Sequence, residues 1–170
     1  MSEIQRTERL KIRWNSIAPG AEFEFRPLFP EDAKELAAIE LKTFATPWSE
    51  VSLRNCLEAC TIQGEAVILH NRIVGYIITQ CVCDEGHILN LAVQESFRHL
   101  GLGKSLLQRF QETAKSWKIT SIYLEVRSSN LIAQRLYFSM GYAPVAVRKR
   151  YYPDGEDALI LLKHLTNGNK

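Results

Sequence analysis

Apolar residues recur every three or four positions in four segments of the chain, which predicts four helices. Pro30, followed by two acidic residues, suits the start of the first helix, and Ser49 suits the N-cap of the second. Gly141 is the residue type expected just beyond the end of the fourth helix. The predicted helices cover residues 30–43, a segment after Ser49 that reaches Cys60, and residues 103–117 and 131–140.

Shorter runs alternate between apolar and polar residues or are continuously apolar, which predicts strands. We expect Asn71-Arg72 to turn an early hairpin, and a Tyr-Tyr-Pro-Asp-Gly turn to separate the last two strands. A strand–helix–strand crossover lies in the middle. This order predicts a mixed α/β fold with a mainly antiparallel sheet and helices on both faces. The predicted strands cover residues 22–26, 66–70, 73–83, 86–93, 121–126, 145–150 and 157–165.

The chain of 170 residues is long enough for one domain with a substantial core. We expect that domain over residues 21–165, after an arm over residues 1–20 and before a tail over residues 166–170. A net charge of +2 argues against nucleic acid or an anionic membrane as the main partner. No apolar stretch approaches the roughly 20 residues that span a bilayer, and the first residues lack a signal peptide's apolar block. We therefore expect a cytoplasmic protein.

The cysteines leave zinc binding and simple packing as alternatives. The chain has four of them: Cys56 and Cys60, spaced i,i+4 on a predicted helix, and Cys81 and Cys83, spaced i,i+2 on a predicted strand. The C-x-x-C spacing of zinc knuckles is absent, and cysteine packs as a small hydrophobe in a reducing compartment. We expect packing, with no disulfide framework and no metal. His87 and His99 also lack metal-ligand spacing, and we assign them no catalytic role.

The segment from Arg98 to Lys104 follows a predicted strand and opens the third helix. The first N–H groups of a helix have no intrahelical partner, and the helix dipole adds positive charge there, so this segment suits a phosphate. Gly101 and Gly103 carry no Cβ and would let a phosphate approach the backbone closely. The third glycine of a dinucleotide fingerprint and the Gly-Lys-Ser/Thr of a Walker A loop are both absent. A glycine-rich helix start that binds nothing is the alternative.

Arg98-x-x-Gly101-x-Gly103, preceded by Leu91-Ala92-Val93, resembles the acetyl-CoA pyrophosphate loop of the Gcn5-related N-acetyltransferase (GNAT) superfamily. The resemblance implies a GNAT fold, in which the strand before the loop bulges and splays from the next strand and opens a slot for pantetheine. It implies that backbone groups of Leu91 and Val93, in the strand segment that includes Ala92, bond the acetyl-pantetheine arm. It also implies that Asn130 touches the cofactor. The pyrophosphate would be held by the N–H groups of His99, Leu100, Gly101, Leu102, Gly103 and Lys104.

Further segments of the chain, which occur in the order that they have in the family, narrow the resemblance. Over residues 22–165, the chain resembles the RimI-type ribosomal-protein-alanine N-acetyltransferases. This implies an enzyme with acetyl-CoA as co-substrate and no metal. Its implied partner is a protein N-terminal peptide, the N-terminal alanine of the eighteenth small-subunit ribosomal protein. The segments are Pro47-Trp48-Ser49-Glu50, Leu124-Glu125-Val126-Arg127-x-Ser129-Asn130, Leu136-Tyr137-x-x-x-Gly141-Tyr142, and Arg148-Lys149-Arg150-Tyr151-Tyr152-Pro153 with Glu156-Asp157-Ala158.

Glu125 and Tyr137 are the candidate catalytic residues. Strand alternation places Glu125 on one face with Tyr123 and Arg127, where it could be a surface glutamate paired with Arg127. Beside the slot, its carboxylate could instead bind an ammonium and accept a proton, since an N-terminal amine has a pKa of about 7.7–8.0. Tyr137 could simply pack at the core, or its phenol, with an ordinary pKa of about 10, could protonate a departing thiolate. The resemblance implies that Glu125 is the general base and Tyr137 the general acid.

Two other functions stay open. One is an N-acetyltransferase with a broader N-terminal, lysine or small-amine substrate. The other is a non-catalytic acyl-CoA-binding sensor, which would need the glycine loop but neither Glu125 nor Tyr137.

Tyr151 and Tyr152 are adjacent on a predicted extended segment. Neighbouring side chains on such a segment face opposite sides, so we expect one to pack inward and the other to line a peptide groove. The three basic residues before them are expected to form a solvated face.

Overall fold

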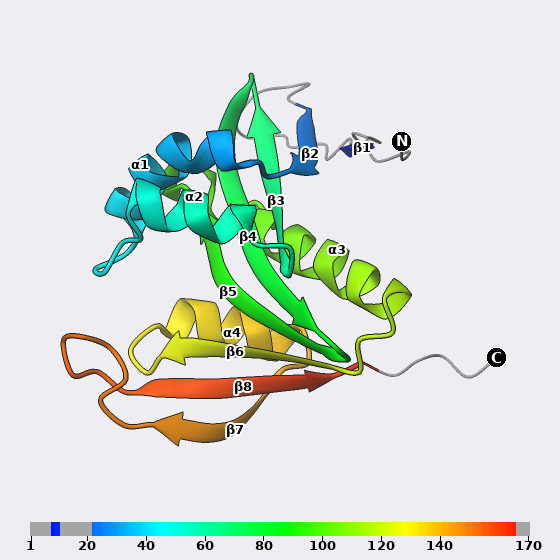
Figure 1. Ribbon diagram of the computed structural model, residues 1–170. Coiled ribbons are helices and arrows are strands. Elements are labelled where there is room, and N and C mark those ends of the chain that lie inside the picture. Colours follow the sequence, from blue (N-terminus) through cyan, green and yellow to red (C-terminus); the bar gives the residue numbers. More distant parts are fainter. Residues whose placement is uncertain (1–7, 11–21, 166–170) are drawn as a thin grey trace.

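The computed structural model describes residues 8–10 and 22–165 of the chain. Within these residues, eight strands form one twisted sheet with the order β1-β2-β3-β4-β5-β6-β8-β7 (Figure 1). The strands are β1 (Glu8–Leu10), β2 (Phe23–Pro27), β3 (Ile62–Leu69), β4 (Arg72–Val82), β5 (Glu85–Val93), β6 (Ser121–Arg127), β7 (Ala143–Arg148) and β8 (Ala158–His164).

Neighbouring strands of this sheet are antiparallel except for β5 and β6, which are parallel. The chain passes from β5 to β6 through α3 (Leu102–Ser116). This connection is the strand–helix–strand crossover that the sequence predicts. The mixed α/β class and the mainly antiparallel sheet are therefore confirmed.

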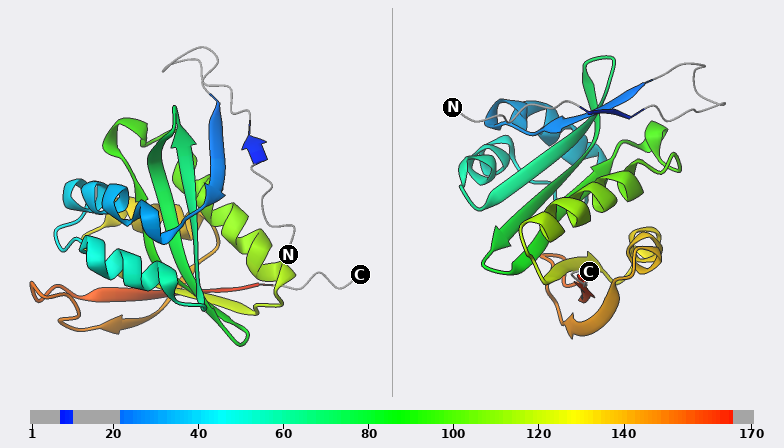
Figure 2. Two further views of the ribbon diagram at one scale, coloured as in Figure 1. Left: turned by 45° about the horizontal axis from the view of Figure 1, so that its top comes forward. Right: turned by 90° about the vertical axis from the view of Figure 1, so that its right-hand side faces the viewer.

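Helices cover both faces of the sheet, as predicted (Figure 2). They are η1 (Pro30–Asp32), α1 (Ala33–Thr43), α2 (Glu50–Glu58), η2 (Glu95–Phe97), α3 and α4 (Leu131–Ser139). Leu36 of α1 and Leu53 of α2 are fully buried in a core with Tyr76 of β4. On the other face, Leu106 and Phe110 of α3 belong to a second core that also contains residues of α4.

The ends of two helices follow their predicted signals. The Ser49 hydroxyl accepts a hydrogen bond from the N–H of Ser52 at 3.1 Å, so Ser49 is the N-cap of α2. Gly141 follows α4 with a φ of 83°, in the left-handed region that favours glycine. The third helix was predicted up to Trp117, but α3 ends at Ser116, and Trp117 is 44% exposed.

Two loops begin earlier than predicted. The β3–β4 hairpin turns at His70 and Asn71, whose φ angles are 49° and 60°, and not at Asn71-Arg72, because Arg72 is already the first residue of β4. The strand predicted up to Arg150 ends at Arg148, because Arg150 has a φ of 53° and lies in a turn. Both errors involve residues that have a positive φ although they are not glycine. The hydrophobic pattern of the sequence does not predict such residues.

At the edge of the sheet, β1 pairs antiparallel with β2. The rest of the predicted arm over residues 1–20 and the predicted tail over residues 166–170 lie outside the described residues. In the part of the chain that the structure describes, no helix is both long and apolar enough to span a membrane.

Candidate functional site

The neighbouring strands β5 and β6 diverge part-way along the sheet (Figure 1), and we call the gap between their backbones the slot. The two strands pair only as far as Ile88 on β5 and Leu124 on β6, and their later residues do not pair with each other. Further along, β5 stays paired with β4 up to Val93, which lies opposite Gly75. Among the described residues, the edge of β5 over residues 89–93 therefore has no neighbouring strand on the slot side, which is the splay that the resemblance implies.

A bulge in β5 precedes the open part of the slot. The register between β4 and β5 shifts at Leu89, which has no partner of its own on β4. Beyond it, Leu91 and Val93 pack toward the core under α3, whereas Ala92 is buried in the core under α1 and α2. The three residues predicted to bind the pantetheine arm thus lie on the unpaired edge of β5.

The loop before α3 offers open backbone donors. None of the N–H groups of residues 99–104 donates a hydrogen bond to another described residue. Gly101, the N-cap of α3, has a φ of 76° and no capping side chain, and a Cβ at this position would meet no atom of the described residues within 4 Å other than its own chain neighbours and the adjoining helix backbone. The first turn of α3 also contains no acidic residue. These features suit an anion at the positive end of the helix dipole.

The side chains of this loop divide between core and solvent. Leu100 and Leu102 are 8% and 1% exposed and hold the loop on the core, whereas His99 and Lys104 are exposed. At Gly103, a Cβ would lie 3.3 Å from a side-chain carbon of α4. The two leucines can therefore offer a ligand only their backbone groups. The missing Cβ at Gly103 lets α3 pack closely against α4.

Glu125 lies at the vertex of the slot, one residue beyond the last pairing of β6 with β5. Its side chain is 13% exposed, and each carboxylate oxygen has one partner. Oε2 lies 2.7 Å from Nε2 of His87, and Oε1 accepts a hydrogen bond from Nη1 of Arg148 at 2.9 Å. The hydrogen bond from His87 and the electrostatic interactions with His87 and Arg148 lower the pKa of Glu125, although burial opposes them. Glu125 is therefore ionised at neutral pH.

Sequence reasoning missed both of these contacts. The alternative pairing of Glu125 with Arg127 is wrong, because carboxylates of the β7–β8 loop hold Arg127. His87 reaches Glu125 because the parallel register places it opposite Tyr123, two residues before Glu125 on the same face of the sheet. Arg148 reaches it from β7, the outermost strand on that side. Only knowledge of the strand register would have identified these partners.

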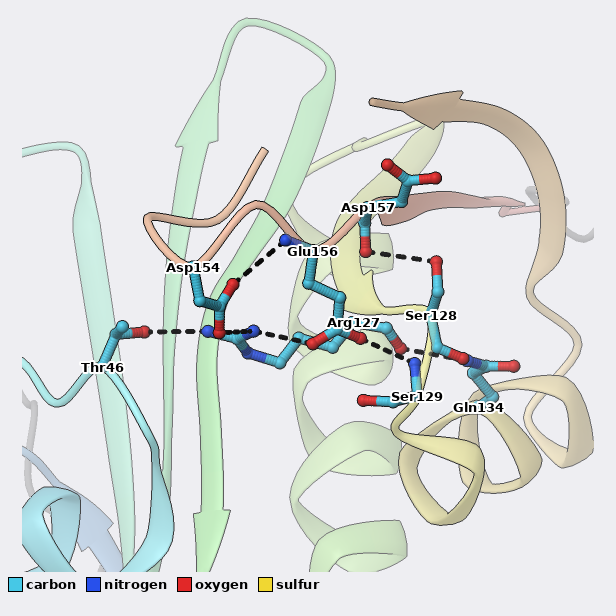
Figure 3. A network of polar contacts seen from close by, with 8 residues as sticks. All are labelled: Thr46, Arg127, Ser128, Ser129, Gln134, Asp154, Glu156 and Asp157. Atoms are coloured by element: carbon cyan, nitrogen blue, oxygen red, sulfur yellow. Dashed lines mark hydrogen bonds and ion pairs between the residues drawn. The ribbon is translucent and has the colours of Figure 1, made fainter. Parts of the chain in front are cut away.

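Arg127, at the end of β6, joins two loops (Figure 3). Its Nη1 lies 2.7 Å from the carboxylates of Asp154 and Glu156 in the β7–β8 loop, and its Nη2 lies 3.3 Å from Oγ1 of Thr46 in the α1–α2 loop. The guanidinium also stacks over the ring of Tyr152, 3.9 Å from the ring centroid. The α1–α2 and β7–β8 loops are thereby both held to the end of β6.

Tyr137 of α4 is 7% exposed and packs edge-on against Tyr142, with ring centroids 5.7 Å apart. Its hydroxyl makes no hydrogen bond to a described residue, so this buried polar atom lacks a partner within the described structure. Burial, and to a smaller extent Tyr142 and Tyr152, raise the pKa of Tyr137 well above its ordinary value. Tyr152 lies within electrostatic reach of both Tyr137 and Glu125, so the two candidate catalytic residues share a neighbour.

Tyr151 and Tyr152 do not face opposite sides, contrary to the prediction. Their rings meet edge to face, with centroids 5.1 Å apart and an interplanar angle of 83°. The reason is that the segment turns after Arg148 and is not extended. The basic side chains before them are exposed, as expected, although Arg148 and Lys149 form ion pairs with acidic residues.

Asn130 is the N-cap of α4. Its Oδ1 accepts a hydrogen bond from the N–H of Ala133 at 3.1 Å. The side-chain N–H groups donate to no described residue, so they are available to a ligand.

A buried carboxyl group lies on the face of the sheet covered by α1 and α2. Glu40 of α1 is 0% exposed and accepts hydrogen bonds from Nδ2 of Asn90 at 2.6 Å, from the backbone N–H of Trp48 at 2.8 Å and from the hydroxyl of Tyr76. It joins α1 to β4, to the α1–α2 loop and to the residue after the β5 bulge. Its position one helical turn after Leu36, on the buried face, is a sequence signal that could have identified it.

The prediction that the cysteines pack in the core is confirmed for only two of them. Cys56 and Cys81 are partly buried, and burial raises the pKa of both thiols. Cys60 lies beyond the end of α2 and Cys83 lies in the β4–β5 turn, and both are exposed. Across residues 8–10 and 22–165, no group of three or more His, Cys, Asp or Glu side chains could hold a metal ion.

Comparison with known proteins shows the family. Residues 25–142 match the acetyltransferase (GNAT) family. The chain is 36% identical over 139 residues to a [ribosomal protein bS18]-alanine N-acetyltransferase of Haemophilus ducreyi, covering 79% of this chain and 95% of that protein. It is 34% identical over 152 residues to an uncharacterised N-acetyltransferase of Methanocaldococcus jannaschii, covering 84% and 92%. The crystal structure of the ribosomal-protein-S18-alanine N-acetyltransferase from Escherichia coli has a TM-score of 0.79 and 29% identity, covering 87% of this chain and 98% of that one. The chain therefore belongs to the acetyltransferase (GNAT) family and is an acetyl-CoA-dependent N-acetyltransferase.

Proposed function

We propose that this enzyme acetylates a protein N-terminal amine, and that its acceptor is the N-terminal alanine of ribosomal protein bS18 in the cytoplasm. The observation that carries the proposal is the position of Glu125, an ionised carboxylate at the vertex of the slot. From that vertex, β5 leads to the open N–H groups before α3. The acceptor is supported by relatives named for bS18, with 34–36% identity.

The residues along the slot fit acetyl-CoA. The open N–H groups of residues 99–104 would bind the pyrophosphate, and the open face of Gly101 leaves room for it. Backbone groups of Leu91 and Val93, with Ala92 between them, would bond the pantetheine arm, and Asn130 would donate a side-chain N–H. Acetyl-CoA supplies the thioester carbonyl, which backbone donors near Leu91 and Val93 would polarise.

In the proposed reaction, the acceptor and acetyl-CoA bind together and the amine attacks the thioester directly. Glu125 would accept the proton of the ammonium, directly or through water. Because an N-terminal amine has a pKa of about 7.7–8.0, this step is only modestly uphill near neutral pH. Tyr137 would protonate the departing thiolate of CoA, since burial keeps its phenol protonated and its hydroxyl is not engaged elsewhere in the described structure.

Acetyl transfer to synthetic peptides tests the acceptor. We expect a peptide with the bS18 N-terminal sequence to be acetylated on its α-amine, located by mass spectrometry. Replacing its first alanine by tryptophan should lower kcat/KM by at least about tenfold, because the acceptor groove must exclude the larger side chain. Equal rates with both peptides, or transfer to lysine side chains, would favour the broader amine substrate. Binding of acetyl-CoA in calorimetry without transfer to any amine would favour the sensor.

Tyr137→Phe tests the general acid. We expect kcat to fall about 10- to 100-fold, because a thiol with an ordinary pKa of about 8.5 needs only part of the help that a general acid can give. Stability in urea should hardly change, since the ring stays and the lost hydroxyl has no hydrogen-bond partner among the described residues. Tyr142→Phe, which removes a hydroxyl from the adjacent ring, is the control and should keep kcat. An unchanged kcat in Tyr137→Phe would assign proton donation to another group.

A further inference from the structure

We propose that His87 is a positioning residue for Glu125. The inference rests on the proposed function, in which Glu125 is the base. The mechanism above does not use His87, yet its Nε2 lies 2.7 Å from Oε2 of Glu125.

His87 and Arg148 hold opposite oxygens of the Glu125 carboxylate. Arg148 donates to Oε1 at 2.9 Å from β7, and His87 approaches Oε2 from β5. The carboxylate is only 13% exposed, and with one partner on each oxygen its orientation is fixed. A base at the vertex of the slot is useful only if it points at the incoming amine, so these contacts bear directly on the rate.

The charge of Glu125 fixes which nitrogen of His87 carries the proton. An ionised carboxylate only accepts hydrogen bonds, so Nε2 must be the donor, and the neutral imidazole then has its lone pair on Nδ1. Nδ1 makes no hydrogen bond to a described residue. The side chain of His87 is 36% exposed and lines a cavity of about 270 Å³. The ring of His87 therefore has one hydrogen bond within the described residues, the one that orients Glu125.

Two substitutions at His87 test the hydrogen bond. In His87→Gln, the amide N–H can replace the Nε2–H donor, whereas His87→Ala removes the donor. The measurements are kcat with saturating acetyl-CoA and alanine-first peptide and the KM of each substrate, since a residue that only orients the base changes kcat and not substrate binding. The control is His164→Gln, the same change at an exposed histidine at the end of β8.

We expect His87→Ala to lower kcat by about tenfold. His87→Gln should keep kcat within about threefold of the wild type, and His164→Gln should keep the wild-type kcat. The KM for acetyl-CoA should not change in either variant.

A wild-type kcat in His87→Ala, or a His87→Gln enzyme as slow as His87→Ala, would overturn this inference and leave the proposed function intact. Failure of the wild-type enzyme to acetylate the peptide at any pH would contradict the proposed function, and the inference would fall with it.

Discussion

Glu125→Gln is expected to lower kcat/KM for an alanine-first peptide by about 10²- to 10⁴-fold, because a carboxamide cannot accept the proton of the amine. The substitution keeps the size of the side chain and leaves an oxygen and an amide group beside His87 and Arg148. Binding of acetyl-CoA, measured by calorimetry, should not change, since the proposed pyrophosphate and pantetheine contacts come from backbone groups elsewhere in the slot. A loss of rate with intact binding would therefore be specific to the proton transfer.

The same variant should remain folded. Arg148 is 54% exposed, and ion pairs with an exposed partner contribute about 0–1 kcal/mol. Because folding lowers the pKa of Glu125, its stabilising effect is present above the ordinary glutamate pKa and is lost as the pH falls through the lowered value. Urea unfolding should thus differ from the wild type by less than about 1 kcal/mol at neutral pH and converge with it in acid. Glu112→Gln, at an exposed position on α3, is the matched control and should keep full activity. A folded Glu125→Gln enzyme with wild-type kcat/KM would exclude Glu125 as the base.

Local signals predicted most of the fold, because each depends on a few neighbouring residues. The hydroxyl of Ser49 caps α2 and Gly141 follows α4, and neither needs any knowledge of the rest of the chain. The turn at His70 and Asn71 is harder, because histidine is not the usual residue at positive φ. The two exposed cysteines were placed on regular elements because the apolar pattern continues past the ends of α2 and β4.

Only part of the candidate site could be predicted from the sequence. The face on which Glu125 lies follows from the two-residue period of a strand, so alternation along β6 was sufficient. Its contacts with His87 and Arg148 depend on how β5 and β7 lie beside their neighbours, which no local pattern encodes. The assignment of the open loop to acetyl-CoA came from the family resemblance, since the residues themselves indicated only an anion. The roles of the individual loop residues therefore stay predictions.

Glu40→Ala is expected to lower the free energy of unfolding by about 3–5 kcal/mol. The substitution removes the acceptor of three donors, the Tyr76 hydroxyl, the Asn90 amide and the Trp48 N–H, and a buried donor without a partner costs about 1–3 kcal/mol. Urea unfolding followed by circular dichroism measures the loss. Lys34→Ala, at an exposed position of the same helix, should change stability by less than about 0.5 kcal/mol.

A double-mutant cycle with Tyr76→Phe shows whether the loss comes from these hydrogen bonds or from the cavity that alanine leaves. Burial and the neighbouring Glu40 raise the pKa of Tyr76, so its hydroxyl stays protonated and donates. Without that hydroxyl, one donor fewer is stranded when the carboxyl group is removed, so Glu40→Ala should cost less in the Tyr76→Phe background than in the wild type. Strictly additive losses would instead assign the cost to packing. The same carboxyl group accepts hydrogen bonds from Asn90, which follows the β5 bulge, and from Trp48 in the α1–α2 loop, so Glu40→Ala also removes a contact from each of these two segments.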